Sequence, residues 1–214
     1  RWKETTGTTL VEAYGLTETS PAACMNPMNL QEFNGMIGLP ISSTEVAIQD
    51  NDWNDLPLGE SGEICIRGPQ VMQGYWHRPK ETANVLSADG WLHTGDIGVM
   101  NDEGFVKIVD RKKDMILVSG FNVFPNEIEG VIAEHPDVLE VGVVGKPDEK
   151  SGESVMAVIV KKNPELTEDS IKAFCRENLT AYKIPRTIIF TNELPKTNVG
   201  KILRREIRDK YVDH

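Results

Sequence analysis

The feature that most constrains the fold is a change of sequence pattern near residue 110. Before it, stretches of alternating apolar and polar residues, such as 44–48 and 62–67, are separated by a long turn-rich segment. Alternation with a period of two predicts half-buried strands. After it, apolar residues at helical spacing are interleaved with further strand patterns. We therefore expect a small β-subdomain at 1–110 and a compact α+β domain at 111–214.

Proline and capping residues indicate where the helices of residues 111–214 begin and end. Pro125 suits the first turn of a helix that ends before Pro136, and Thr167 is a candidate cap for a second helix. A final helix is expected to begin at about Lys201 and to bury Ile202, Leu203 and Ile207. Strands are expected at 115–118, 138–144, 154–160 and 187–190, with a Gly-Phe-Asn loop before the first helix.

Charge is distributed unevenly about the same boundary. Residues 1–110 hold 6 Lys and Arg against 16 Asp and Glu, whereas residues 111–214 hold 17 of each sign. This acidic balance argues against a nucleic-acid partner. One basic cluster is interrupted by Glu206 and Asp209, so we interpret its arginines as the solvated face of a helix. Its members are Lys201, Arg204, Arg205, Arg208 and Lys210.

Four short segments contain residues suited to nucleotide chemistry. Asp96 follows Thr94-Gly95, and a turn there would present its carboxylate to ribose hydroxyls, while Arg111 could donate to the same sugar or to phosphate. Lys201 follows a flexible Asn-Val-Gly loop, where an ammonium could reach an anion. The segments are Tyr14–Glu18, Asp89–Gly98, Asp110–Asp114 and Lys196–Lys201.

Each of these residues also has an ordinary structural interpretation. Tyr-Gly-x-Thr-Glu is compatible with simple turn chemistry, and Asp96 with a helix cap or an Asp turn. Lys113 and Lys201 could be solvated lysines, and Gly120 a turn glycine. Taken one by one, the ordinary interpretations are favoured, and only the combination of motifs outweighs them.

That combination resembles the acyl-adenylate-forming enzymes, and most closely the bacterial long-chain fatty-acid-CoA ligases, along essentially the whole chain. The resemblance implies that 1–110 is the C-terminal part of the large AMP-binding domain and that 111–214 is the small mobile C-terminal domain. No segment matches the family's phosphate loop. We therefore expect a C-terminal fragment that has little or no activity alone.

The resemblance also implies roles for individual residues. The residues within 1–110, together with Arg111, would bind the nucleotide. Those further along the chain would act in the change from the first half-reaction to the second. Tyr14 would stack on adenine, Thr17 would contact phosphate, Glu18 would bind magnesium, Asp96 and Arg111 would hold the ribose, Lys113 would be the hinge, Gly120 would enter the thiol tunnel, and Lys201 would be the catalytic lysine.

The implied activity is that of an acid-thiol ligase with ATP and Mg²⁺ as cofactors and CoA as co-substrate. A fatty acid would be converted through an acyl-adenylate to its acyl-CoA. The open alternatives are a ligase for another acid and a non-catalytic nucleotide-binding or interaction module. We expect a cytoplasmic protein with peripheral contact to the membrane, because no spanning segment or signal peptide is visible, and a homodimer at full length.

Overall fold

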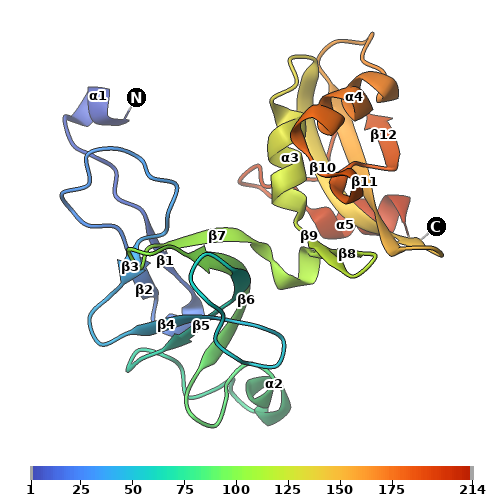
Figure 1. Cartoon of the computed structure of the whole chain (residues 1–214). Helices are drawn as coiled ribbons and strands as arrows, with labels where there is room; N and C mark the ends of the chain where they lie inside the picture. The colour runs from blue at the N-terminus through green and yellow to red at the C-terminus, as the bar shows by residue number, and fades with distance from the viewer. Residues whose placement is uncertain (1, 213–214) are drawn as a thin grey trace. The chain divides into compact units, whose positions relative to one another are not determined.

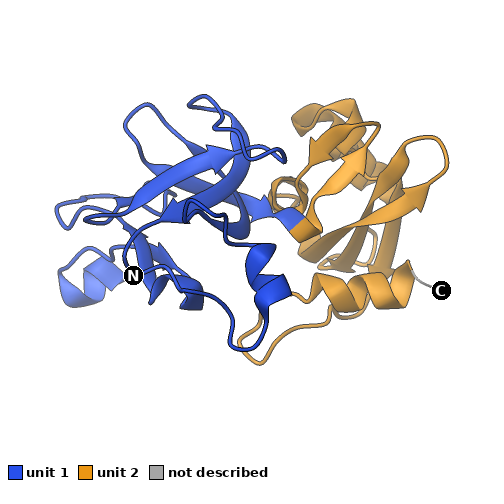
Figure 2. Cartoon of the chain, turned by 90° about the horizontal axis from the view of Figure 1, so that it is seen from below, with its two compact units in different colours: residues 1–112 blue, residues 113–214 orange. Residues whose placement is uncertain are grey.

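The computed structural model describes residues 2–212 and separates into two compact units, residues 1–112 and 113–214, shown in two colours in Figure 2. The observed boundary lies two residues after the expected one. The structure is of the α+β class, as predicted. Each unit is described by itself below.

Two antiparallel sheets form the first unit. The sheet orders are β1-β2-β3 and β4-β5-β6-β7. In the sequence, a short helix α1 (Trp2–Thr6) precedes β1, a one-turn helix η1 (Thr17–Thr19) lies between β1 and β2, and α2 (Pro79–Ala83) lies between β5 and β6. The strands are β1 (Ala13–Gly15), β2 (Ala22–Met25), β3 (Leu39–Pro40), β4 (Glu45–Gln49), β5 (Ser61–Arg67), β6 (Leu92–Met100) and β7 (Val106–Arg111).

The core of this unit is shared by its two sheets. Ala23 of β2 packs with Ile48 of β4, Ile64 and Ile66 of β5, and Val106 of β7. Each of these side chains is at most 5% exposed. Ile64 and Ile66 point to the same side of the sheet because side chains alternate along a strand. Glu63 and Cys65 on the other side are buried as well, so β5 is not the half-buried strand that the alternation predicted.

The second unit is built on one mixed sheet. Along one edge, β11 (Gly152–Lys161) pairs antiparallel with β10 (Val138–Asp148). Along the other edge it pairs in parallel with β12 (Thr187–Thr191), and at Gly152 it pairs antiparallel with β8 (Ile116–Val118). β8 continues into β9 (Phe121–Val123) through a hairpin. The segment expected to be a Gly-Phe-Asn loop is therefore the turn and second strand of this hairpin.

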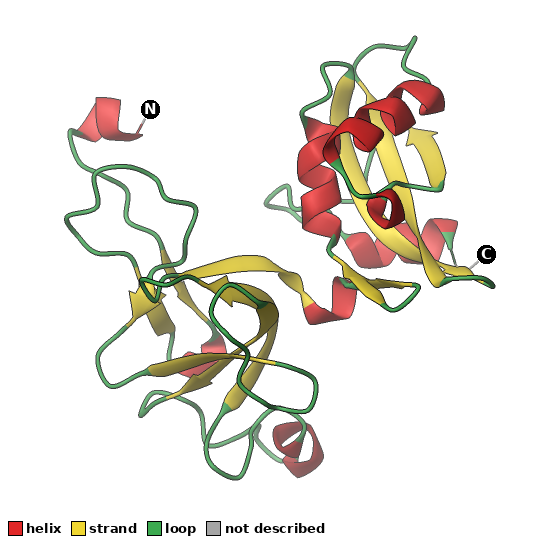
Figure 3. Ribbon diagram, in the orientation of Figure 1, coloured by secondary structure: helices red, strands yellow, loops and turns green. Residues whose placement is uncertain are grey.

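Helices cover both faces of that sheet (Figures 1 and 3). α3 (Pro125–Ala133) and α4 (Glu168–Asn178) pack on the side of Val155, Ala157 and Ile159, and α5 (Arg204–Tyr211) packs through Ile207 on the side of Met156, Val158 and Val160. Because both faces of β11 are buried, the strand is a continuous apolar run. A one-turn helix η3 (Ala181–Lys183) lies between α4 and β12.

Two of the helix starts agree with the sequence prediction and one does not. Pro125 is the first residue of α3, and the Thr167 side chain accepts the Ser170 N–H at the start of α4. The last helix begins at Arg204 rather than at Lys201. The reason is a competing pairing, since Lys196 and Ile202 form a β-bridge and the Leu203 N–H donates to the Pro195 carbonyl.

Candidate nucleotide-binding site

Asp96 lies inside strand β6, and not on a turn as the sequence suggested. On β5 and β6, Cys65 pairs with His93 and Glu63 with Ile97, so three β6 residues, Thr94 to Asp96, lie opposite Ile64. This is a β-bulge, in which extra residues bend the strand and redirect a side chain. Gly95 adopts φ 73°, a conformation in which glycine carries no steric cost.

The bulge brings Asp96 together with Tyr14 and Arg111. The Tyr14 hydroxyl donates to Oδ2 of Asp96 at 2.7 Å, and Nε of Arg111 lies 3.5 Å from Oδ1. Asp96 is 8% exposed, whereas the Arg111 side chain is 53% exposed. Burial, and then the hydrogen bond to Asp96, raise the pKa of Tyr14, which therefore stays a neutral donor. Three predicted site residues thus form one hydrogen-bonded group.

Thr17 and Glu18 lie on η1, which Leu16 separates from β1. Thr17 is exposed, and Oε1 of the half-buried Glu18 accepts a 2.8 Å hydrogen bond from the Tyr75 hydroxyl. Within residues 2–212 no cluster of three or more His, Cys, Asp or Glu could hold a metal ion. A single carboxylate still fits Mg²⁺, because this ion is commonly bound by one or two carboxylates together with substrate phosphates.

A cavity of about 270 Å³ lies beside Glu18 in the first unit. Its wall contains five titratable side chains together with the bulge residues Thr94 and Gly95; the five are those of Glu18, Glu63, Tyr75, His93 and Lys112. The Trp53 ring stacks on His93 with centroids 4.1 Å apart. The bulge that carries Asp96 therefore also borders a polar cavity.

Glu63, which the sequence analysis did not single out, is the buried centre of this wall. Its carboxylate is 5% exposed and accepts the Gly95 N–H and the Lys112 ammonium, each at 2.8 Å. Nδ1 of His93 lies 3.5 Å from the same carboxylate. The sequence did contain a signal for this residue, namely a glutamate directly before the apolar stretch of β5. A carboxylate in such a buried position requires partners, so it could have been singled out.

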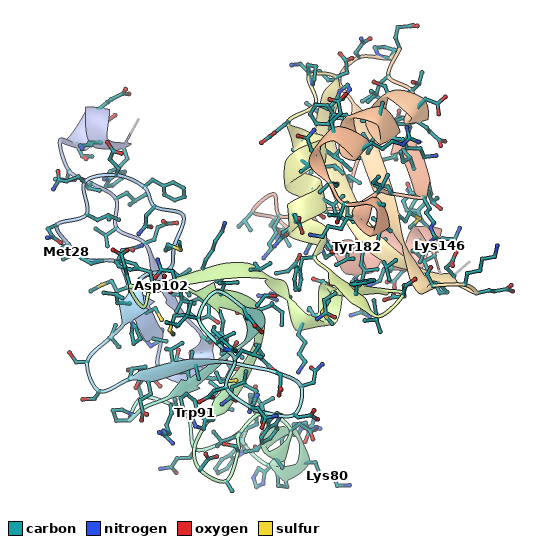
Figure 4. All side chains as sticks on the ribbon, in the orientation of Figure 1. Met28, Lys80, Trp91, Asp102, Lys146 and Tyr182 are labelled. Carbon is teal, nitrogen blue, oxygen red and sulfur yellow. The ribbon has the colours of Figure 1, made fainter. Side chains whose placement is uncertain are left out.

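Lys113 and Gly120 lie near the start of the second unit. Lys113 is exposed and is the central residue of the one-turn helix η2 (Lys112–Asp114). Gly120, with φ 84°, and Ser119, with φ 52°, form the two-residue turn between β8 and β9. Two positive φ values are typical of a type I′ hairpin turn. Next to it, the Phe121 ring stacks on Tyr182, labelled in Figure 4, at 4.7 Å.

Lys201 is an exposed residue of the loop before α5. Its carbonyl accepts the Thr197 N–H at 2.8 Å and its own N–H donates to the Thr197 hydroxyl at 3.1 Å. The backbone of this loop is thus fixed while the side chain extends into solvent. Because α5 starts three residues later, Lys201 does not lie at the start of the helix, where the sequence had placed it.

The interpretation of the basic cluster as a solvated face is wrong for two of its arginines. Arg205 is exposed, with 86% of its side chain accessible. Arg208 instead contacts one oxygen of the buried Asp114 through two nitrogens, at 3.0 and 3.1 Å. Arg204 donates to Glu129 at 2.9 and 2.6 Å. The acidic partners lie 75 to 94 residues upstream, so spacing within the helix could not reveal them.

The sequence matches two patterns that describe AMP-binding enzymes. Residues 1–76 match the AMP-binding enzyme family, and residues 127–201 match the AMP-binding enzyme C-terminal domain. These ranges contain Tyr14, Thr17, Glu18 and Lys201, whereas Asp96, Arg111, Lys113 and Gly120 fall between them.

Similar proteins include ligases for more than one acid. A long-chain-fatty-acid–CoA ligase of Escherichia coli O6:H1 is 57% identical over 210 residues, which cover 98% of this chain and 37% of that protein. A 2-succinylbenzoate–CoA ligase of Bacillus cytotoxicus is 40% identical over 94% of this chain and 42% of its own length. ATP-bound MatB from Rhodopseudomonas palustris superimposes with a TM-score of 0.90 at 34% identity, over 99% of this chain and 42% of that one. The chain thus spans well under half of each.

Proposed function

Because the chain belongs to the AMP-binding enzymes, we propose that it is part of an ATP-dependent acid-thiol ligase that converts a long-chain fatty acid to its acyl-CoA through an acyl-adenylate. The observation that carries the proposal is the group formed by Tyr14, Asp96 and Arg111. A buried carboxylate held between a neutral phenol and an exposed guanidinium can accept hydrogen bonds from vicinal ribose hydroxyls.

The first unit would hold the nucleotide. Asp96 accepts from the ribose, and Arg111, which is half-exposed, donates to the sugar or to phosphate. The Tyr14 ring offers a face for adenine, and Thr17 offers a hydroxyl to phosphate. Glu18 would hold Mg²⁺, which supplies positive charge to the phosphates when bound. The Tyr75 hydroxyl orients the Glu18 carboxylate for this role.

The second unit would supply the mobile charge. A carboxylate that attacks the α-phosphate of ATP approaches another anion, so the reaction requires a positively charged group near the phosphate. The Lys201 ammonium is exposed on a loop with a fixed backbone, which allows it to approach and to withdraw. Rotation about Lys113 would exchange Lys201 for the hairpin turn at Gly120, so that the CoA thiol can attack the acyl carbon.

Of the two alternative functions, a ligase for another acid is supported by a specific observation. The 2-succinylbenzoate–CoA ligase is similar to this chain along nearly the same residues, so nucleotide binding does not distinguish the acids. The long-chain assignment is supported by the higher identity to the fatty-acid–CoA ligase of Escherichia coli. A non-catalytic module is disfavoured because Glu18, Asp96 and Lys201 are all present.

We also propose that the enzyme works in the cytoplasm and contacts the membrane peripherally, because its substrate would be an amphiphile. No helix within residues 2–212 is long and apolar enough to cross a bilayer. The homodimer expected from the resemblance is part of the same proposal. Analytical ultracentrifugation of the chimera described in the next paragraph tests it, because the sedimentation coefficient distinguishes a dimer from a monomer.

The ligase activity is tested in a chimera in which this chain replaces the 210 matching residues of the Escherichia coli ligase. Acyl-CoA formation is measured with ATP, CoA and fatty acids of graded length. We expect acyl-CoA formation, which would support the roles proposed for the nucleotide-binding residues and for Lys201. A folded chimera that binds ATP but acts on no acid would refute the proposal. The isolated chain serves as the comparison and should form little or no product.

A further inference from the structure

We propose that two ionic clamps, one inside each unit, confine the hinge motion to the single residue Lys113. The first clamp is the pair formed by Lys112 and Glu63. The second is the group formed by Asp114 with Arg204 and Arg208. The inference rests on the proposed two-step function, because it specifies how the rotation between half-reactions is restricted.

The first clamp fixes the residue before the hinge. The Lys112 ammonium donates to Oε2 of Glu63 at 2.8 Å, and that carboxylate is 5% exposed. Without this cation the buried carboxylate would keep only the Gly95 N–H and the neighbouring His93, so the pair opposes release of Lys112 from the first unit. The other carboxylate oxygen accepts the Gly95 N–H at 2.8 Å. One side chain therefore connects the last residue of the first unit to the bulge that presents Asp96.

The second clamp fixes the residue after the hinge. Asp114 is 8% exposed, and its Oδ1 accepts from both terminal nitrogens of Arg208. Arg204 lies 3.5 Å from the other oxygen and also donates to Glu129 of α3. Arginine suits this position because its planar group can serve two carboxylates at once. Asp114 is thereby tied to α5, which begins three residues after Lys201.

Lys113 differs from both neighbours. Its side chain is exposed and makes no hydrogen bond or ion pair within the described part of the chain. A hinge absorbs its torsion change at a few residues in loops or at the ends of elements. With Lys112 and Asp114 held from opposite units, the rotation would be taken up by the φ and ψ angles of Lys113, and it would open the one-turn helix η2. The clamps thus make Glu63 and Asp114 positioning residues, which transmit the hinge geometry to Asp96 and Lys201.

The experiment measures the distribution of distances between spin labels on the 214-residue chain. One label is attached at Lys80→Cys in the first unit, labelled in Figure 4, and one at Glu149→Cys in the second; both positions are exposed, whereas the three natural cysteines are buried. The clamp variants are Lys112→Gln and Arg208→Gln. The matched controls are Lys107→Gln and Arg205→Gln, which remove an exposed charge of the same type nearby. Circular dichroism checks that each variant is folded.

We expect each clamp variant to lose the wild-type distance distribution and to spread over distances that the wild type does not sample, while both controls keep it. In the chimera, the same clamp variants should slow both half-reactions by about tenfold to 100-fold, because small misplacements of catalytic groups have effects of that size. Lys112→Gln leaves Glu63 bonded to Gly95, so it tests the clamp even if Arg208→Gln does not fold. Folded clamp variants with the wild-type distribution would overturn the inference. The distance measurement needs no turnover, so an inactive chimera would count against the proposed function and not against the clamps.

Discussion

The hydroxyl of Tyr14 donates a 2.7 Å hydrogen bond to Oδ2 of Asp96, across 82 residues of sequence. It joins β1 to the bulge of β6 and therefore connects the two sheets of the first unit. Arg111 holds the other oxygen of the carboxylate, so Asp96 is supported from two sides and still faces an exposed cation. The stability of the first unit and its proposed nucleotide binding would therefore depend on the same three side chains.

Removing the Tyr14 hydroxyl should destabilise the first unit. Tyr14→Phe deletes a hydrogen bond to a buried charged group, and we expect a loss of about 1.5–3 kcal/mol. Urea unfolding followed by tryptophan fluorescence measures it, since all four tryptophans, at positions 2, 53, 76 and 91, lie in this unit. Tyr75→Phe is the matched control, because it deletes a hydrogen bond to the less buried Glu18. Equal losses in the two variants would contradict this account.

Stability of the first unit should also fall in alkaline solution. Burial and the Asp96 hydrogen bond raise the pKa of Tyr14 in the folded state above its usual value of 10.0. The unfolded chain therefore releases this proton first, and the contribution, complete below pH 10, declines as pH rises above it. Urea titrations from pH 8 to 11 should show a steeper decline in the wild type than in Tyr14→Phe. Parallel curves would exclude Tyr14 as the cause.

Replacing Arg208 should destabilise the second unit much more than replacing Arg205, although the two residues lie three positions apart on α5. Arg208→Ala leaves the buried Asp114 with a weaker partner, and we expect a loss of about 1–3 kcal/mol in the unfolding free energy of the second unit. Arg205→Ala removes an exposed ion pair with Asp209 and should change it by less than about 0.5 kcal/mol. Hydrogen exchange of β11 amides reports this unit specifically. A similar small effect for both would restore the solvated interpretation of the cluster.

The sequence predicted the parts of the fold that depend on local pattern. The strand pattern of β5, the proline at the start of α3 and the Thr167 cap act within a few residues, and the structure contains all three elements, although β5 is buried on both sides at Glu63 to Ile66 rather than half-buried. The features that it did not reveal depend on distant partners. The bulge at Asp96 requires the register of β5 against β6, and the burial of Arg208 requires Asp114, 94 residues away. Lys201 was placed on the helix because its apolar neighbours have helical spacing, whereas a backbone pairing between Lys196 and Ile202 delays the start of the helix to Arg204.

Gly120 should be costly to replace for a reason that does not involve any ligand. Its φ is 84° and no atom lies within 4 Å of the position of an added Cβ, so Gly120→Ala is opposed by backbone conformation alone, by about 1–2 kcal/mol. Gly130→Ala, in the middle of α3 and equally free of neighbours, should stabilise the unit by about 0.5–1 kcal/mol. Thermal unfolding of the two variants separates these effects. A neutral Gly120→Ala would show that the hairpin turn tolerates another conformation.

Lys201→Ala should impair one half-reaction and spare the other. In the chimera, its removal takes away the positive charge that offsets the approach of two anions, and we expect acyl-adenylate formation to fall by about 100-fold to 1,000-fold. Conversion of preformed acyl-adenylate with CoA should remain within about threefold of wild type, because Lys201 would be withdrawn in that step. Lys150→Ala, which removes another exposed lysine of the second unit, is the control. Since Lys201 is exposed and its loop is fixed by backbone contacts with Thr197, the variant should fold normally. Equal losses in both half-reactions would mean that Lys201 acts in a shared binding step rather than in adenylation.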